Sequence, residues 1–281
     1  MSRQLRESYQ YCEQLAFSHY ENFPVASLLI PREKRKHVAA IYAFARIADD
    51  YADEPGLIAA ERLEKLRTWE QQLSECYGGK AIHPVFVALG ETANEFSIPQ
   101  GLFHRLLKAF GSDVTTTRYE VFNDVLAYCT NSANPVGRLV LLLFGYVDKH
   151  LAILSDHICT ALQLTNFWQD LSVDLAKDRI YLPLEDLRRF GVTVEELRSR
   201  KASEAFRHLM EFEVERTASL FEQGKPLLRE VGKDLRLQLR MTWLGGMEIL
   251  SKIRRRDFDV LSHRPVLSGL DNARLVLKAI V

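Results

Sequence analysis

Apolar residues recur along most of this chain at steps of three and four, the spacing that places them on one face of an α-helix. Two successive series of this kind are Val38, Ile41, Tyr42, Ala45 and Ala48, then Leu63, Leu66, Leu73 and Cys76. Alternating β-branched runs, which are typical of strands, are scarce. Prolines and glycines separate the helical series, and neither a repeat of fixed period nor a low-complexity linker divides the chain. Residues 1–281 are therefore predicted to form a single all-α domain of about a dozen helices.

Composition excludes several classes of protein. Hydrophobic residues make up 47% of the chain, which predicts a well-buried core. Lys+Arg and Asp+Glu balance at 37 each, whereas nucleic-acid binders usually carry a basic surplus, so no nucleic-acid partner is expected. The four cysteines form no C-x-x-C pair, and we expect reduced, buried thiols.

The termini and apolar runs bear on localisation. The first residues are charged and have no apolar signal core. The longest apolar run, about Leu139 to Val147, is too short to span a bilayer. The prediction is a cytoplasmic chain that is able to make peripheral, transient contact with the inner membrane surface.

Two acidic pentads are the candidates for chemistry, because the chain has no P-loop, G-x-G-x-x-G, G-x-S-x-G or H-E-x-x-H motif. The first runs from Asp49 to Asp53 and follows Arg46. The second runs from Asp170 to Asp174 within an otherwise apolar segment. In each pentad two aspartates lie four apart and share a helix face, where like charges repel unless a cation lies between them.

Carboxylate pairs on facing helices suit Mg²⁺, which prefers hard oxygen ligands and is often held together with substrate phosphates. Such a site makes a diphosphate a leaving group by Lewis-acid catalysis. Arg46 and Arg179 are candidate phosphate contacts. An allylic or cyclopropylcarbinyl cation left behind needs a dry, aromatic cavity. The candidate aromatic residues near the motifs are Phe23, Tyr42, Phe44, Tyr128, Phe167 and Trp168. Each of these rings, taken singly, is also explained by core packing.

A polar stretch interrupts the helical pattern between residues 121–131 and 138–144. Asn134-Pro135 is expected to kink or end a helix there, and Gly137 permits close approach of another group to the backbone. Asn131, Ser132 and Asn134 either hold a water beside the cavity or cap the broken helix.

Three ordered blocks of the sequence resemble the squalene/phytoene synthase family, from about His19 to Arg264. The blocks are Tyr42-Ala-Phe-Ala-Arg46-Ile-Ala-Asp49-Asp-Tyr-Ala-Asp53, Tyr128-Cys-Thr-Asn-Ser-Ala-Asn-Pro-Val136-Gly137, and Gln163-Leu-Thr-Asn166-Phe-Trp-Gln-Asp170-Leu-Ser-Val-Asp174 followed by Arg179-Ile-Tyr181-Leu-Pro183. The resemblance implies the all-α isoprenoid synthase fold, with a central cavity between helices and diphosphate bound through Mg²⁺.

The family's residue roles carry over by position. The resemblance implies catalytic and metal-binding roles for Asp49, Asp53, Asp170 and Asp174, with Asn166 as a further metal ligand. It implies substrate contacts at His19, Asn22, Phe23, Tyr42, Arg46, Tyr128, Asn134, Val136, Gly137, Gln163 and Arg179.

Several positions depart from the family pattern. Gln169 stands where Arg or Glu commonly precedes the aspartate of the second motif, and Cys159 stands where Gly is common. The N-terminal motif reads His19-Tyr-Glu-Asn22-Phe23 and has no lysine, and Gly246 replaces an aromatic residue. Losing the arginine and the lysine together is expected to weaken a second diphosphate site. An enzyme that joins two prenyl diphosphates needs two such sites, whereas an enzyme acting on one joined intermediate needs only one.

The strings around Glu21–Ser27, Ser132–Arg138 and Asn166–Asp170 resemble the bacterial hydroxysqualene synthase branch of the family. This resemblance implies that presqualene diphosphate and water give hydroxysqualene and diphosphate, on the squalene route to hopanoids. It also implies hand-off with a presqualene diphosphate synthase and a downstream reductase. No NAD(P)H is expected. A head-to-head condensing synthase, making presqualene diphosphate, squalene or phytoene, is the alternative. A more remote alternative is a non-catalytic helical interaction module with an acidic face.

Overall fold

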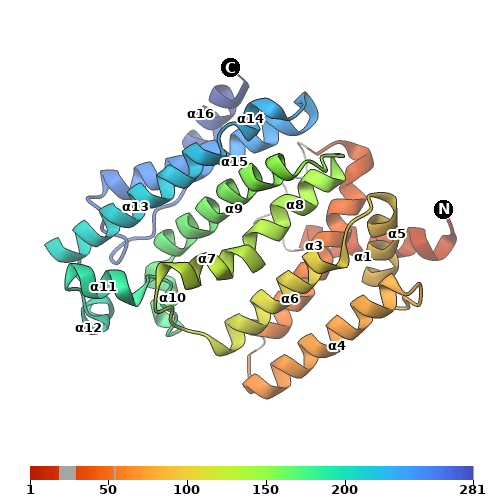
Figure 1. The fold of residues 1–281 in the computed structure, drawn as a ribbon, viewed down its shortest axis with the longest axis horizontal. Coiled ribbons are helices and arrows are strands. Elements are labelled where there is room, and N and C mark those ends of the chain that lie inside the picture. The colour runs from red at the N-terminus through yellow and green to blue at the C-terminus, as the bar shows by residue number, and fades with distance from the viewer. Residues whose placement is uncertain (19–29, 54, 281) are drawn as a thin grey trace. The chain divides into compact units, whose positions relative to one another are not determined.

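The computed structural model describes residues 1–18, 30–53 and 55–280, which are helical with no β-strand among them. The predicted all-α class is therefore confirmed (Figure 1). The chain divides into two compact units, Met1–Thr115 with Pro135–Asp148 (unit 1) and Thr116–Asn134 with Lys149–Val281 (unit 2). That residues 1–281 form one domain with a central cavity stays a prediction.

The helices of unit 1 are α1 (Arg3–Ser18), α3 (Arg32–Asp53), α4 (Ala59–Tyr77), α5 (Pro84–Glu95) and α6 (Gln100–Thr115), with most of α8 (Ala133–Leu143). The helices of unit 2 are α7 (Phe122–Asn131), α9 (Lys149–Gln169), α10 (Leu171–Ala176), α11 (Leu184–Phe190), α12 (Val194–Arg198), α13 (Glu204–Gly224), α14 (Leu227–Glu230), α15 (Lys233–Arg255) and α16 (Gly269–Ile280).

The core of unit 1 is an aromatic cluster to which four helices contribute one ring each. Phe44 of α3 stacks on Trp69 of α4, with ring centroids 6.1 Å apart. It also meets Phe86 of α5 and Phe103 of α6 edge-on, at 5.9 and 5.1 Å. All four rings are at most 1% exposed. Phe44 is thus a core residue, as core packing predicts, and the cluster fixes α3 against its neighbours.

A buried polar contact also joins three helices of unit 1. Tyr9 of α1 and His37 of α3 each share a hydrogen bond with Thr92 of α5, at 3.1 and 3.0 Å. Burial lowers the pKa of His37 to about 4, so the ring is neutral at physiological pH. The buried face of α3 beside these residues is rich in alanine, which lets α1 and α5 approach closely.

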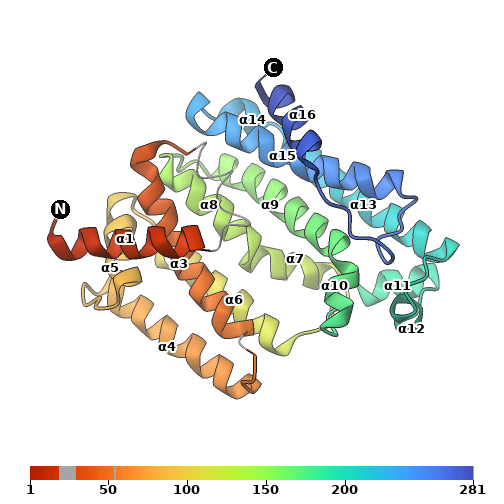
Figure 2. The ribbon, with the colours of Figure 1, turned by 180° about the vertical axis from the view of Figure 1, so that it is seen from behind.

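The core of unit 2 is built on α9 and α13, which run side by side in both views (Figures 1 and 2). They are in close contact at Gly224, where a Cβ would lie 2.5 Å from Ile158 and 2.8 Å from the Leu154 carbonyl. Trp168 of α9, which is fully buried, donates its indole N–H to Thr217 of α13 at 2.8 Å. This ring is therefore a core residue as well.

Position 246 in α15, where the family commonly has an aromatic residue, has no room for a side chain. A Cβ there would lie 2.3 Å from the ring of Phe221 and 3.0 Å from Leu162. The Phe221 ring, which comes from α13 and is fully buried, already fills the space that a side chain at 246 would enter. Glycine at position 246, in place of the family's aromatic residue, is thus explained by the Phe221 ring that packs against it.

The polar stretch before Pro135 ends one helix and begins another. Helix α7 ends at Asn131, close to the predicted end of the 121–131 segment. Helix α8 begins at Ala133, five residues before the predicted segment at 138, so Asn134 and Pro135 lie in its first turn. Proline is tolerated there because the first backbone N–H groups of a helix have no partner within it. The boundary between the two units falls at this same turn.

In unit 2 a buried carboxyl group joins α11 to α13. Glu213 is fully buried, and both its oxygens accept hydrogen bonds at 2.7 Å from Arg216, which also binds Asp186 at 2.7 Å. The Arg216 guanidinium lies over the ring of Phe122, 3.4 Å from its centroid. Burial raises the pKa of Glu213 to about 8 despite the nearby arginine.

No helix among the described residues is long and apolar enough to cross a membrane.

The raised pKa of Glu213 makes stability depend on pH. The folded chain keeps this proton up to about pH 8, whereas the unfolded chain loses it near pH 4.5, so this group stabilises the fold less as pH rises between those values. The protonated Glu213 carboxyl also donates a hydrogen bond to Asp186, and Glu213→Gln keeps this donor and the acceptor for Arg216 without titrating. Relative to the wild type, its free energy of unfolding should therefore increase by about 1 kcal/mol or more between pH 5 and pH 8. Urea unfolding at both pH values measures this, and a pH-independent difference would contradict it.

Candidate functional site

The first acidic motif forms a polar stripe along α3. Tyr42, Arg46, Asp49 and Asp53 follow one another at steps of four, three and four, which places them on one face of the helix. The alanines and Phe44 behind them are buried in unit 1. The stripe therefore remains the accessible side of a helix that is otherwise packed.

Arg46 supplies the positive charge of this stripe. Its Nη1 lies 3.5 Å from Asp49, and its Nη2 donates to Asp50 at 2.5 Å. Its Nε is buried and has no hydrogen-bond partner among the described residues. Burial raises the pKa of Tyr42, so its phenol keeps its proton and remains a hydrogen-bond donor. The N–H groups of Arg46 and the O–H of Tyr42 suit an anionic ligand.

The second acidic motif lies where α9 ends. Gln163, Asn166 and Asp170 follow at steps of three and four and share one face of this segment, on which Asn166 is exposed. The prediction that Asp170 and Asp174 lie on one continuous helix needs correction. Helix α9 ends at Gln169, and Asp170 is the N-cap of the short helix α10, which contains Asp174. The Asp174 N–H still donates to the Asp170 carbonyl at 2.9 Å, so the two aspartates remain one turn apart.

The linker between α15 and α16 contacts this motif, and Figure 2 shows it running toward α10. Arg264 of the linker binds both carboxylate oxygens of Asp170, with Nη2 at 3.2 Å from Oδ2. This hydrogen bond raises the pKa of Arg264. Gln169 is buried and donates its side-chain amide to the Pro265 carbonyl at 2.6 Å. In the described structure, therefore, Gln169 holds the linker and Arg264 neutralises Asp170.

Four aromatic rings cluster beside the second motif in unit 2. Phe167 and Tyr181 stack face to face, with centroids 3.7 Å apart and planes 6° apart. Tyr119 and Tyr128 complete the group, each with centroids 5.6–5.9 Å from its neighbours. Tyr119 and Tyr181 are brought together because residues 117–120 pair with 180–185 through backbone hydrogen bonds. Tyr128 is half-buried and the other three rings are buried.

The polar stretch at the junction of α7 and α8 contains three side chains that differ in their hydrogen bonding. Asn134 is buried, and its side-chain oxygen accepts a hydrogen bond from Thr160 at 2.9 Å. Asn131 donates to the Ala127 carbonyl of its own helix at 2.9 Å. The Ser132 hydroxyl is buried without a hydrogen-bond partner among the described residues. Of the three, Ser132 therefore has the capacity to hold a small polar molecule.

The remaining predicted residues are distributed as follows. Val136 in α8 is exposed, with 47% of its surface accessible, and Gly137 follows it. Arg179 is partly buried, and its N–H donates to the Asp174 carbonyl at 2.9 Å, which ties it to the second motif. His19, Asn22 and Phe23 lie outside the described residues.

The donor set of the motifs fits a magnesium-bound diphosphate by its chemistry. Asp49, Asp53, Asp170, Asp174 and Asn166 offer only hard oxygen ligands, which Mg²⁺ prefers. The orphaned Nε of Arg46 fits a phosphate oxygen. Within the described ranges, no three His, Cys, Asp or Glu side chains form a metal-binding group. The magnesium assignment therefore stays a prediction.

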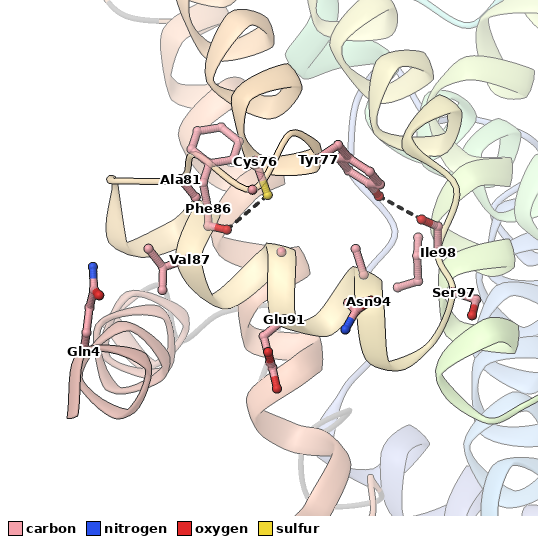
Figure 3. A pocket seen from close by; sticks show the side chains of 13 residues that line it. Gln4, Cys76, Tyr77, Ala81, Phe86, Val87, Glu91, Asn94, Ser97 and Ile98 are labelled. Carbon is pink, nitrogen blue, oxygen red and sulfur yellow. Dashed lines mark hydrogen bonds between the residues drawn. The ribbon is translucent and has the colours of Figure 1, made fainter. Parts of the chain in front are cut away.

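Two hollows on unit 1 are lined by none of the motif residues, whereas a third, of about 400 Å³, is lined in part by Tyr51 of the first pentad. One of about 560 Å³ lies over the packed seam of α4 and α5, where Cys76 donates to the Phe86 carbonyl and Tyr77 to that of Ile98 (Figure 3). Another, of about 690 Å³, lies between α4 and α6. No predicted site residue lines either hollow.

Three contributors to the site were not predicted from the sequence. Tyr119 belongs to no helical series, and Tyr181, although part of the third block, is not among the predicted aromatic residues. Arg264 follows the second motif by 94 residues, and no local spacing relates the two. The signal that could have found Tyr181 is its place directly after Arg179 and Ile180 in the third block.

Comparison with known proteins agrees with the motifs. The family model of squalene/phytoene synthase matches residues 17–271. A hydroxysqualene synthase from Rhodopseudomonas palustris is 39% identical over 240 residues, covering 84% of this chain and 80% of that protein. A phytoene synthase from Arthrospira platensis is 29% identical over 271 residues, covering 92% and 87%.

A solved structure gives the same result for the fold. The crystal structure of squalene synthase HpnC from Alicyclobacillus acidocaldarius matches with a TM-score of 0.88 and 40% identity, covering 92% of this chain and 97% of that one. A dehydrosqualene synthase matches with a TM-score of 0.87 and 26% identity. The predicted isoprenoid synthase fold is confirmed, and the chain belongs to the squalene/phytoene synthase family.

Proposed function

We propose that this chain is a hydroxysqualene synthase, which converts presqualene diphosphate and water to hydroxysqualene and diphosphate. The observation that carries the proposal is that the uncharged side chain of Gln169 is buried and already hydrogen-bonded. Gln169 stands where the family commonly has a charged side chain, and it is bonded to the Pro265 carbonyl. Position 169 therefore supplies no cation for a second diphosphate, and a reaction with one diphosphate substrate needs none.

Sequence likeness supports the same choice. Hydroxysqualene synthases match at 36–39% identity, whereas the phytoene synthases match at 26–30%. The phytoene synthases, however, extend over 92–93% of this chain. That coverage favours head-to-head condensation of prenyl diphosphates as the second candidate.

In the proposed reaction, Asp49, Asp53, Asn166, Asp170 and Asp174 hold Mg²⁺. Mg²⁺ held by these residues would supply Lewis-acid chemistry, which neutralises a diphosphate and makes it a leaving group. Arg46 donates N–H groups, including its orphaned Nε, to the phosphate oxygens. Gln163, Tyr42 and Arg179 are the further proposed contacts of the substrate. The role of His19, Asn22 and Phe23 at the substrate stays a prediction.

The bonds and charges of the reaction balance without a redox cofactor. The carbon–oxygen bond to diphosphate breaks and its electron pair leaves with the diphosphate. The carbocation rearranges, and a water oxygen forms the new carbon–oxygen bond while its proton is released. The stacked rings of Phe167 and Tyr181, with the tilted ring of Tyr128, are proposed to exclude bulk water and stabilise positive charge, at about 0.5–2 kcal/mol per ring. The unpartnered hydroxyl of Ser132 is proposed to position the attacking water.

Further parts of the proposal concern partners. The substrate and the product have long apolar chains that are poorly soluble in water. We therefore propose that a presqualene diphosphate synthase passes the substrate to this chain and that a downstream reductase receives the product, in squalene and hopanoid biosynthesis. Such an enzyme is proposed to act in the cytoplasm, at the inner face of the membrane.

The metal proposal is tested by Asp53→Asn and Asp170→Asn. Each removes one carboxylate charge, and turnover of presqualene diphosphate should fall by about three orders of magnitude or more. Helix content, measured by circular dichroism, should barely change, because Asp53 is the last residue of α3 and Asp170 lies between α9 and α10. Chelation with EDTA should abolish turnover, and added Mg²⁺ should restore it.

Asp148→Asn is the matched control, because Asp148 is an exposed aspartate outside both motifs. It should turn over like the wild type. Near-wild-type turnover in both motif variants would refute the metal assignment.

The identity of the attacking group is tested with purified protein and presqualene diphosphate in H₂¹⁸O without NADPH. The label should appear in the alcohol of the product, as measured by mass spectrometry. Ser132→Ala should shift products toward eliminated hydrocarbons while diphosphate release continues, since only the water contact is lost. Squalene formed solely when NADPH is supplied would contradict the proposal, and so would efficient coupling of two farnesyl diphosphates.

Asn134→Leu separates water placement from packing at the same turn. This change leaves the buried Thr160 hydroxyl without its acceptor, which should cost about 1–3 kcal/mol of stability. A product shift in Asn134→Leu that is absent from Ser132→Ala would move the water-holding role from Ser132 to Asn134.

A further inference from the structure

Helix α16 presents an apolar face to the outside of unit 2. Leu270, Ala273, Leu277 and Ile280 follow at steps of three, four and three, and Val276 widens the same face. The leucines and Ile280 are 65–85% exposed, which is unusual for large apolar side chains gathered on one helix face. We call these five residues the outer face of α16.

The orientation of α16 is fixed by contacts to α15 on its other side. Near its first turn, Asp271 pairs with Lys252 of α15 at 2.7 Å. At its last turn, the Ala279 carbonyl accepts a hydrogen bond from Arg240 of α15 at 3.1 Å. Leu275 and Ala279 are buried between these contacts. Because both ends are held, the outer face cannot turn inward without breaking an ion pair and a hydrogen bond.

The charges around the outer face have one sign. Arg274 and Lys278 lie along one border of it, both exposed, and neither forms an ion pair with another described residue. The only acidic residue of α16, Asp271, is already paired with Lys252 on the inner side. An exposed apolar helix face bordered by basic side chains is typical of a helix that lies in the interface of an anionic membrane.

The size of the outer face favours a bilayer over a second copy of the chain. A helix of 12 residues is about 18 Å long and about 10 Å wide, so its outer face covers roughly 200 Å². A stable protein–protein interface buries about 800 Å² on each partner. A membrane requires no such minimum area, because side chains insert individually and anionic headgroups attract the basic border.

We infer that the outer face of α16 docks on the surface of an anionic lipid bilayer, with Leu270, Leu277 and Ile280 inserted and Arg274 and Lys278 on the headgroups. The helix lies in the interface and does not span it. This assignment rests on α16 alone, and it holds or fails independently of the reaction that the chain catalyses.

Vesicle flotation tests the inference with the full chain and no substrate. The wild type should float with vesicles of phosphatidylcholine and phosphatidylglycerol, bind vesicles of phosphatidylcholine alone more weakly, and be released by high salt. Leu277→Gln with Ile280→Gln should lower binding about tenfold or more, because two inserted side chains become polar. Arg274→Gln with Lys278→Gln should weaken binding to the anionic vesicles and reduce its salt dependence.

Ile82→Gln with Val147→Gln is the matched control, since these side chains are 87% and 81% exposed but lie outside α16. This control should bind vesicles like the wild type. A wild type that does not float, or an α16 variant that floats as well as the control, would overturn the inference. Sedimentation that shows a dimer lost only in the α16 variant, without vesicle binding by the wild type, would assign the face to a second copy instead.

Discussion

Burial of most of the circumference of α3 and α9 is the constraint on which the candidate site depends. Each helix leaves only a narrow stripe for polar groups, since its other sides pack into a core. In α3 the packed side holds alanines and Phe44, and in α9 it holds Phe167 and Trp168 among other apolar residues. Carboxylates on such a stripe are close together and only partly hydrated, so they require cations. The structure supplies these in the form of arginines, Arg46 from α3 itself and Arg264 from the linker between α15 and α16.

Packing also accounts for residues that depart from the family pattern. The absence of a side chain at Gly246 is matched by the Phe221 ring, and the absence of a charge at Gln169 is matched by its bond to the Pro265 carbonyl. At position 246 the Phe221 ring fills the space that a larger side chain would need. At position 169 the Pro265 carbonyl provides a hydrogen-bond acceptor for the glutamine amide. Each of these two substitutions therefore depends on the segment that packs against it, and its effect cannot be read from the substituted position alone.

Much of the helical class and of the motif stripes follows from local spacing, because a period of three to four residues reports directly which side chains share a face. The stripe from Tyr42 to Asp53 was predictable for this reason. The helix end at Gln169 was not predictable, since the spacing of Gln163, Asn166, Asp170 and Asp174 continues the same helical face across it. Tyr119 reaches the site because residues 117–120 pair with 180–185, and Arg264 reaches it through Asp170, 94 residues away; no helical period encodes such separations. The apolar outer face of α16 has the spacing of a buried helix, so its exposure could be learned only from the fold.

The pairing of Arg264 with Asp170 would couple the proposed metal binding at Asp170 to the linker that carries α16. A guanidinium and a divalent ion compete for the same carboxylate oxygens, so any cation that enters at Asp170 weakens the hold of Arg264. By thermodynamic reciprocity, whatever fixes the linker of residues 256–268 against Asp170 lowers the affinity of that carboxylate for the ion by the same factor. The linker thus acts as an intramolecular competitor, in which Arg264 competes with a cation for Asp170 at an effective concentration that the fold determines.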